Sequence, residues 1–260
     1  MRRVVFNQKG GVGKSSIVCN LAAASAAEGY RTLVVDLDAQ ANATYYLTGY
    51  SGHAVPVGIA DFFKQTLNTG GSLKKSRVQV TPTAHDNLHV IAASGELSDL
   101  QAKLESKFKI NKLRKLLVDL SADYERIYID TPPALNFYTY SALIAADSVL
   151  IPFDCDAFAR QALYQVLAQV AELQVDHNES LVLEGIIVNQ YAHTTTLHPT
   201  VVRQLLDEGL PVLPVYLTRS VKMRESHHRC LPLIHLDRRH ALSQQFVELL
   251  HVLEERQGRE

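Results

Sequence analysis

The chain has few cysteines and no long apolar run. Its three cysteines, Cys19, Cys155 and Cys230, are odd in number, lie far apart and form no C-x-x-C pair. This pattern argues against a disulfide framework and favours reduced thiols, as in a cytosolic protein. No apolar stretch approaches the ~20 residues that span a bilayer, and the first residues carry no signal-peptide pattern. These absences predict a cytoplasmic protein.

The chain also lacks an excess of charge of either sign. With 26 Lys and Arg against 27 Asp and Glu, its formal net charge is −1. Any attraction to nucleic acid must therefore come from a local cluster of basic residues. There is no internal repeat, and 260 residues, 47% of them hydrophobic, suit one α/β domain with a full core. We expect a single domain over 1–260, with 68–79 as a flexible or insertion-like loop.

Short β-branched segments alternate with helical patterns along the chain. This alternation is typical of βαβ units, so the predicted fold is α/β, a mostly parallel twisted sheet with helices on both faces. Strands are predicted at 2–6, 32–36, 87–93, 126–130, 147–153, 181–189 and 213–217. Longer helices are predicted at 97–121, 157–175, 197–208 and 239–255. The last of these carries an apolar stripe at helical spacing, which predicts that it packs on the sheet.

A glycine-rich segment follows the first predicted strand. Residues 8–22 read QKGGVGKSSIVCNLA, which we interpret as the Walker A pattern G-x-x-x-x-G-K-[ST]. Glycines let backbone N–H groups turn toward phosphates, and the following helix adds its positive N-terminal end. Lys14 is predicted to meet the β- and γ-phosphates, and the Ser15 hydroxyl to bind Mg²⁺. The predicted nucleotide-binding residues of the loop are Gly10, Gly11, Val12, Gly13, Lys14, Ser15 and Ser16.

A second lysine, Lys9, stands at the front of the loop. It is either a solvated surface lysine or serves a different site. The segment KGGVGKSS is similar to the deviant Walker A motif, K-G-G-x-G-K-[ST], of the ParA/MinD family of ATPases. The resemblance implies that Lys9 reaches across a dimer interface to phosphates bound by a second copy of the chain. A cation supplied in trans stabilises the phosphoryl oxygens in the transition state, as an arginine finger does.

The segment VVDLDAQANAT (34–44) is similar to the family motif V-D-x-D-x-Q-x-N. The resemblance implies that Asp36 lies near the Mg²⁺ or packs against the phosphate loop, and that Asp38 orients or deprotonates the attacking water. Ligands of such sheets bind at the carboxyl ends of the strands, which favours this position for a catalytic carboxylate. Lys9, Lys14 and Asp38 are therefore the predicted catalytic residues.

Two further strand ends complete the predicted site. In RIYIDTPPALN (126–136) an apolar strand ends in Asp130, the Walker B arrangement, and DTPP resembles the family's switch segment. Ser15, Asp36 and Asp130 are thus the predicted metal-site residues. Asn189 follows another apolar strand, where the family reads the adenine edge with an amide that both donates and accepts. An ordinary Asx turn is the alternative for Asn189.

A basic segment, 217–240, carries six Lys and Arg residues against Glu225 and Asp237. It is loosely similar to a stretch of the family pattern, although Thr218 and His227 stand where that pattern has prolines. ParA-type members bind DNA non-specifically as ATP dimers and are released by a partner protein. The resemblance implies a homodimer, a ParB-like or other stimulating partner, and nucleoid association of the ATP form. The predicted DNA-binding residues are Arg219, Lys222, Arg224 and Arg229. A solvated basic face is the alternative, and 72–77 is a second basic candidate.

Other branches of the family are alternatives. A MinD- or FlhG-like ATPase would act on a membrane or protein partner without DNA, but Glu248, Glu254 and Glu255 on the last helix would repel acidic headgroups. We therefore expect no membrane partner. An iron–sulfur reductase of this family needs cluster-binding cysteines that the sequence does not place at the expected segment. The sequence also shows no small-substrate signature of an amidoligase. The predicted function is a slow, partner-stimulated Mg²⁺-dependent ATPase that dimerises around ATP, binds DNA and positions a plasmid, chromosome or protein cluster.

Overall fold

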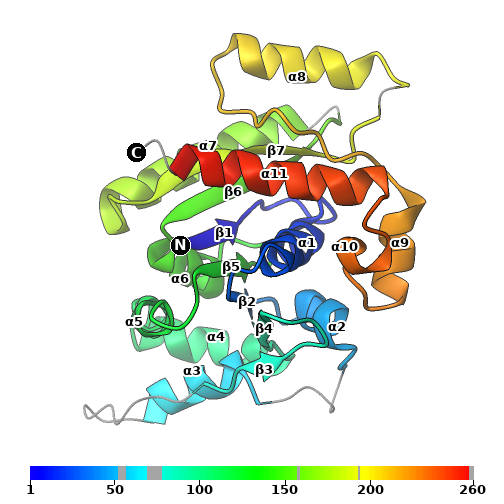
Figure 1. The fold of residues 1–260 in the computed structure, drawn as a ribbon. Helices are drawn as coiled ribbons and strands as arrows, with labels where there is room; N and C mark the ends of the chain where they lie inside the picture. Colours follow the sequence, from blue (N-terminus) through cyan, green and yellow to red (C-terminus); the bar gives the residue numbers. More distant parts are fainter. Residues whose placement is uncertain (52–56, 69–77, 157–158, 193, 258–260) are drawn as a thin grey trace.

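The structure is a computed structural model that describes residues 1–51, 57–68, 78–156, 159–192 and 194–257. The described residues form a seven-stranded sheet in the order β3-β4-β2-β5-β1-β6-β7 (Figure 1). Within this sheet only β3 runs antiparallel, against β4. The predicted α/β fold with a mostly parallel sheet is confirmed. The strands are β1 (Arg2–Val5), β2 (Thr32–Asp36), β3 (Thr81–Pro82), β4 (Leu88–Ile91), β5 (Arg126–Asp130), β6 (Ser148–Asp154) and β7 (Val182–Asn189).

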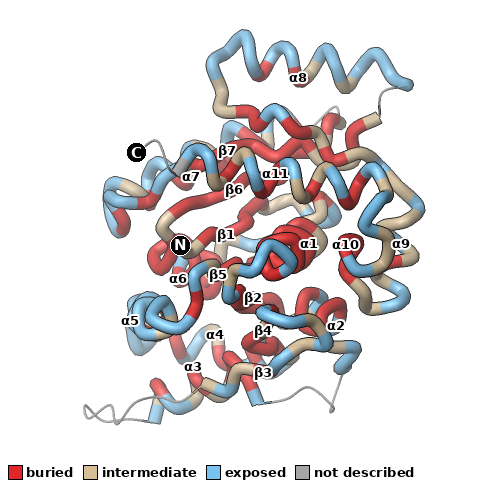
Figure 2. The backbone as a smooth tube through the Cα atoms, in the orientation of Figure 1, coloured by how far each residue is buried: buried red, intermediate tan, exposed pale blue. Residues whose placement is uncertain are grey.

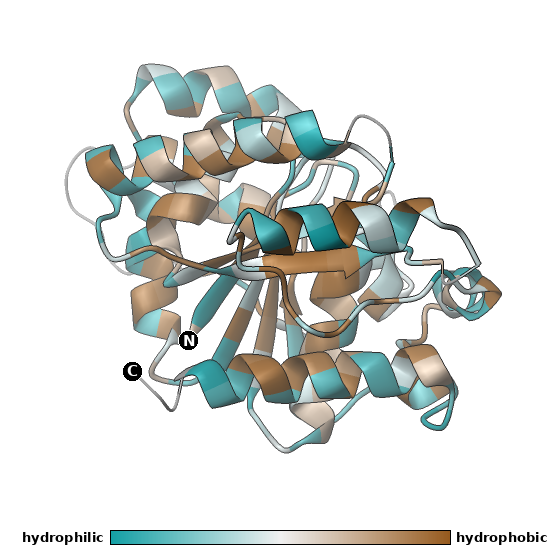
Figure 3. Cartoon of the chain, turned by 90° about the horizontal axis from the view of Figure 1, so that it is seen from above, coloured by the Kyte–Doolittle hydropathy of each residue, from teal (hydrophilic) through white to brown (hydrophobic). Residues whose placement is uncertain are grey.

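Helices cover both faces of the sheet (Figures 1 and 3). One face carries α1 (Lys14–Ala27), α2 (Asn42–Thr48), α10 (Leu233–Leu236) and α11 (Ala241–Gln257), with α9 (Val221–His228) beside α10. The other face carries α3 (Ile59–Asn68), α4 (Glu96–Ser106), α5 (Lys112–Leu120), α6 (Phe137–Ala145), α7 (Ala159–His177) and α8 (Leu197–Asp207). Figure 2 shows that α1 is enclosed by its neighbours along most of its length, so its N-terminus is firmly placed.

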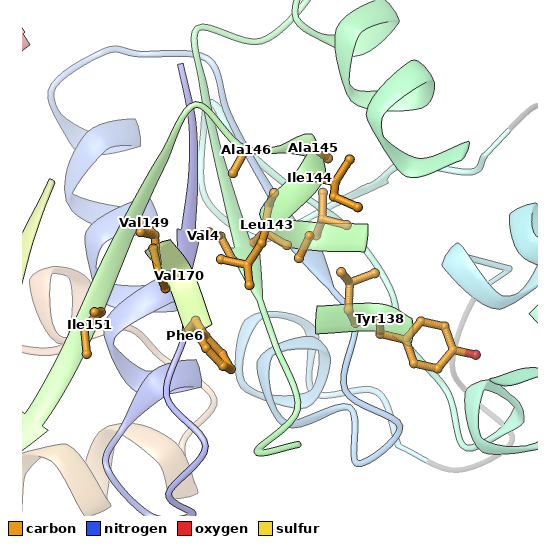
Figure 4. Packing of buried hydrophobic residues seen from close by; sticks show 14 of the residues in the cluster. Val4, Phe6, Tyr138, Leu143, Ile144, Ala145, Ala146, Val149, Ile151 and Val170 are labelled. Carbon is orange, nitrogen blue, oxygen red and sulfur yellow. The ribbon is translucent and has the colours of Figure 1, made fainter. Parts of the chain in front are cut away.

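The core on the α6 side is built from aliphatic side chains of the central strands. This core includes Val4 of β1, Val149 of β6, Leu143 of α6 and Val170 of α7, and Val4 lies between Val149 and Leu143 in Figure 4. All four side chains are at most 2% exposed. Burial of such side chains stabilises each by about 1.5–3 kcal/mol relative to exposure. This packing fixes β1, and with it the loop that leaves β1.

The carboxyl ends of the central strands meet at one edge of the sheet. Asp36 of β2 lies in register with Asp130 of β5, which in turn lies beside Val5 of β1. The glycine-rich loop leaves β1 just after Val5. Ligands of doubly wound sheets bind at this edge. The fold therefore brings the loop and both aspartates together, as the sequence predicted.

Six of the seven predicted strands are present, each within two residues of its predicted bounds. The seventh, at 213–217, is wrong. Its residues run beside β7, and Leu213 and Leu217 donate to the carbonyls of Ile186 and Val188, but the flanking pairs are isolated bridges and no continuous ladder forms. Pro214 has no N–H to donate to a strand ladder, so continuous pairing stops there.

The single helix predicted at 97–121 is also wrong. The chain forms α4 and α5 instead, and the five residues between them break the helix. Phe108 in this break has φ 51°, the left-handed region that ends helices. No glycine or proline stands there to signal the break in the sequence. The predicted basic segment 72–77 lies outside the described residues.

Arg3 of β1 is fully buried and paired, which the sequence did not suggest. Its guanidinium donates to both carboxylate oxygens of Glu184 on β7, each at 3.0 Å, and to Glu254 on α11 at 3.0 Å. Arg126 also pairs with Glu254. Glu254 therefore faces inward. The expected repulsion between Glu254 and acidic lipid headgroups required this side chain to face solvent, so that part of the expectation is wrong. The network ties α11 to the sheet. In the described part of the chain, every helix is too short or too polar to cross a bilayer.

Candidate functional site

The glycine-rich loop has the backbone that phosphate binding requires. Gly11 and Gly13 adopt φ 77° and 93°, which side chains with a Cβ rarely adopt. A Cβ on Gly13 would also lie 2.4 Å from the Asn189 side chain. One element of the sequence interpretation is wrong, because Gln8 stands where the ordinary Walker A pattern has its first glycine. The loop therefore has only the second half of that pattern, preceded by Lys9.

Two cavities of about 440 Å³ each meet at this loop. Gly11, Gly13, Ser16 and His227 line both of them. The lining of the first cavity includes five polar residues, Lys14, Ser15, Asp38, Gln40 and Asn42. The second lies toward α9, and its lining includes Asn189, Gln190, Thr218, Arg219 and Arg224. A polyphosphate in the first cavity and a base in the second would share the loop between them.

Lys14 begins α1 and is almost fully buried in the loop. Its Nζ donates to the backbone carbonyl of Lys9 at 3.2 Å. Burial lowers the pKa of Lys14, and the nearby carboxylates of Asp130 and Asp38 oppose that shift. A cation held at the floor of the first cavity suits the β- and γ-phosphates.

Asp130 ends β5 beside the loop with a carboxylate that the protein leaves largely unsatisfied. Both its oxygens are buried, and neither accepts a well-formed hydrogen bond from the described residues. Burial and the neighbouring Asp36 raise the pKa of Asp130 well above its usual range, whereas Ser15 and Lys14 lower it. A buried carboxylate in this state is stabilised by a cation. Ser15 and Asp130 together therefore fit a divalent cation such as Mg²⁺.

Asp36 has its own protein partners. Its Oδ2 accepts from the Thr44 N–H at 2.8 Å and from the Thr44 hydroxyl at 2.7 Å, and its Oδ1 accepts from the Asp38 N–H at 3.0 Å. Burial raises the pKa of Asp36 to about 6, and the bonds from Thr44 oppose the shift. Asp36 thus positions the loop that carries Asp38. Its role as a metal ligand stays a prediction.

Asp38 lines the first cavity opposite the glycine-rich loop. It is 8% exposed, and its Oδ1 accepts from the Gln40 N–H at 2.9 Å. This bond occupies one carboxylate oxygen and fixes the rotamer, so the other oxygen can accept from a water molecule. The geometry is what a general base needs before substrate binds.

Lys9 points away from the cavity of its own chain. Its side chain forms an ion pair with Asp156 at the end of β6. Among the described residues, the linings of both cavities include the glycines that follow Lys9 but not Lys9 itself. The backbone of Lys9 is held by Asn7, whose Oδ1 accepts from the Lys9 N–H at 2.9 Å. Lys9 is therefore a fixed, partly exposed cation at the mouth of the site.

Asn189 ends β7 and lines the second cavity, as the prediction for a base-reading residue requires. Its Nδ2 donates to the carbonyl of Val12 at 2.8 Å, which ties the end of β7 to the loop.

His227 on α9 is a site residue that the sequence analysis missed. Its Nε2 lies 3.0 Å from the Ser16 hydroxyl, and its ring meets that of Tyr46 edge-on at 4.8 Å. Burial lowers the pKa of His227, so the neutral ring is favoured. The sequence signal for this residue was that a histidine stands at 227, where the family pattern has a proline.

The four predicted DNA-binding residues do not form one free basic face. Arg219 and Arg224 line the second cavity. Lys222 lies 3.1 Å from Glu225 and 4.0 Å from Asp237, and Arg229 lies 3.2 Å from Glu225. Their role in binding DNA stays a prediction.

Comparison with known proteins supports a common family. A family model described as an AAA domain matches residues 3–183. The chain is 33% identical over 257 residues to the chromosome-partitioning ATPase Soj of Treponema pallidum, covering 98% of this chain and 97% of that protein. It is 34% identical over 241 residues to the chromosome partitioning protein ParA of Myxococcus xanthus, covering 90% of this chain and 80% of that protein.

A solved structure is similar over nearly the whole chain. Cobyrinic acid a,c-diamide synthase from Mycobacterium smegmatis, crystallised with an ATP analogue and magnesium, superimposes with a TM-score of 0.82. The two sequences are 26% identical, and the match covers 98% of this chain and 94% of the synthase. That fold thus accommodates an adenine nucleotide and magnesium.

Proposed function

Because the chain belongs to the ParA/MinD family of ATPases, we propose that it is a nucleotide switch that hydrolyses ATP to ADP and phosphate. The observation that carries this proposal is the polar floor of the first cavity. Lys14, Ser15 and Asp38 line it, and Asp130 lies beside Ser15, so the four residues come from two strand ends and one helix terminus. The cofactors are ATP and Mg²⁺.

The protein groups divide the chemistry between them. Backbone N–H groups of the loop and the Lys14 ammonium hold the phosphates and stabilise the charge that builds on the γ-phosphoryl oxygens. Asp38 accepts the proton of the attacking water. Ser15 and Asp130 would hold Mg²⁺, which would supply positive charge to neutralise the phosphates. Asn189 and the second cavity take the adenine.

Lys9 makes the proposed active site shared between two chains. In a single chain it is held by Asp156, outside its own cavity. Two chains that face each other across their ATP molecules would bring each Lys9 to the partner's phosphates. The Lys9 ammonium would then exchange its ion pair with the Asp156 carboxylate for contact with the partner's polyphosphate. Bound ATP would therefore trigger formation of the homodimer.

The proposed role of the switch is to position cargo on DNA. The similar proteins of Treponema pallidum and Myxococcus xanthus are named for chromosome partitioning. In the proposed cycle the ATP dimer binds DNA without sequence preference, associates with the nucleoid and is released when a ParB-like partner stimulates hydrolysis. A MinD-like ATPase that acts on a membrane or protein partner without DNA is the alternative.

Binding to a random-sequence DNA duplex tests this role. We expect binding with ATP and Mg²⁺, and much weaker binding with ADP or without nucleotide. Affinity should fall steeply as salt rises, because phosphate contacts release counterions. Fluorescence anisotropy of a labelled duplex over a salt series measures both effects. ATP-driven dimers that bind no DNA at any salt concentration would support the alternative.

A further inference from the structure

A second basic cluster lies at the junction of α4 and α5. Residues 103–115 contain a single carboxylate, Glu105, and six cations: Lys103, Lys107, Lys109, Lys112, Arg114 and Lys115. This segment therefore carries a net charge of +5 in a chain whose net charge is −1, which leaves −6 for the remainder. Such a local excess is the condition that an almost neutral chain must meet to bind a polyanion.

These cations are exposed or half-buried, and one of them, Lys107, donates to the backbone carbonyl of Leu67 at 3.2 Å. Lys103, Lys107, Arg114 and Lys115 are exposed, and Lys109 and Lys112 are half-buried. The ion pairs found within the described ranges involve none of the six. The pKa of Lys112 is lowered by burial and then by the neighbouring charges of Lys109 and Lys115. The cluster is thus self-repelling, and an anion bound there would relieve that repulsion.

The basic segment around α9 differs in this respect. Lys222 and Arg229 already have Glu225 as a partner, and Arg219 and Arg224 line the nucleotide cavity. Lys222 and Arg229 would have to leave Glu225 to contact DNA, whereas Arg219 and Arg224 are exposed beside the second cavity. The cations at the α4–α5 junction have no ion pair to break among the described residues before they contact DNA.

The position of the junction also suits a partner of the dimer. Helix α4 begins after the carboxyl end of β4, and α5 precedes the amino end of β5, so the junction lies toward the edge of the sheet opposite the cavities. In Figure 1, α5 lies at the left, near the N-terminus, whereas α9 lies at the right. Two chains that meet through their nucleotide loops would leave both junctions uncovered.

Phe108 at the tip of the junction is 89% exposed and could suggest a lipid surface instead. Binding to a bilayer needs an apolar face on the protein. Three apolar side chains of α5, Leu113, Leu116 and Leu117, are buried in the core, and Val118 is 52% exposed. Among the described residues, Phe108 and Val118 are therefore the large apolar side chains that the junction and α5 expose, whereas six cations offer phosphate contacts.

We propose that the α4–α5 surface, defined by Lys103, Lys107, Lys109, Lys112, Arg114 and Lys115, binds the phosphate backbone of duplex DNA. This proposal rests on the proposed role of the ATP dimer on DNA. It assigns to that role a surface remote from the nucleotide. The dimer would carry two such surfaces, so the same duplex could be held at two points and the avidity of the ATP form would exceed that of a single chain.

The test is the salt dependence of duplex binding by the full chain with ATP and Mg²⁺. The variant Lys109→Gln/Lys112→Gln/Lys115→Gln should bind on the order of tenfold more weakly. Its plot of log affinity against log salt should be shallower by about 0.9 for each DNA phosphate that the variant no longer neutralises. The control variant Lys64→Gln/Arg160→Gln/Arg203→Gln removes the same charge from ion-paired positions on other helices. It should bind like the parent.

Folding of both variants is checked by ATP-driven dimerisation, which neither should change. Equal DNA binding by the α4–α5 variant and the parent would overturn this proposal alone. An equal loss in the control variant would also overturn it, because net charge would then explain the effect. A parent chain that binds no DNA would overturn the DNA role as well. Binding to phosphatidylglycerol vesicles that is lost in Phe108→Ala, with DNA binding intact in the α4–α5 variant, would assign the surface to lipid instead.

Discussion

Replacing Lys9 by alanine should abolish ATP-driven dimers while leaving a folded monomer that still binds ATP. The side chain lies outside its own cavity, so its loss leaves Lys14 and the loop glycines in place. A cation supplied in trans contributes to transition-state stabilisation as an arginine finger does, so turnover should fall roughly 10³-fold or more. Sedimentation with ATP, ADP or no nucleotide measures the dimer, and single-turnover hydrolysis measures the rate.

The matched control for this variant is Asp156→Asn. It breaks the ion pair of Lys9 within the chain but keeps the lysine itself. This variant should still dimerise with ATP, because its Lys9 is free to reach the partner's phosphates. Dimers of Lys9→Ala that form with ATP as readily as those of the parent would contradict the trans role.

Replacing Asp38 by asparagine should stop hydrolysis without preventing ATP binding or dimerisation. Asparagine has the same shape and can still accept from the Gln40 N–H, but it cannot take a proton from water. Loss of a general base lowers turnover by about 10²–10⁴-fold. We therefore expect the variant to accumulate as a long-lived ATP dimer, measured by single-turnover hydrolysis beside sedimentation.

A control for charge alone is Asp207→Asn, because this carboxylate lies on the exposed side of α8 near Arg203. Its turnover should match that of the parent. If Asp38→Asn hydrolyses ATP within a few-fold of the parent rate, Asp38 is not the base, and the first cavity positions the water through another group.

Much of the fold and of the phosphate end of the site could be predicted from the sequence. The strand ends that carry Asp36, Asp130 and Asn189 are marked by apolar runs that stop at a polar residue. In a parallel sheet such ends meet at one edge, so the site follows from the strand pattern. Family similarity added the separate role of Lys9, which spacing alone left open.

What the sequence did not predict depends partly on local geometry and partly on contacts between distant residues. The partners of Lys222 and Arg229 became visible only when α9 placed Glu225 one turn away from each. His227 reaches Ser16 across more than 200 residues of chain. The break at Phe108 contains no glycine or proline, so the sequence pattern predicted one continuous helix where the α4–α5 surface lies.

The most direct test of a site shared between two chains is the ATPase rate of a mixture of Lys9→Ala and Asp38→Asn chains, each inactive alone. In a mixed dimer, the site on the Lys9→Ala chain has its own Asp38 and receives Lys9 from the partner. If Lys9 acts in trans, the mixture should hydrolyse ATP well above either variant alone. If Lys9 serves its own chain, neither site in the mixed dimer is complete, and a mixture that stays inactive although mixed dimers form would contradict the shared site.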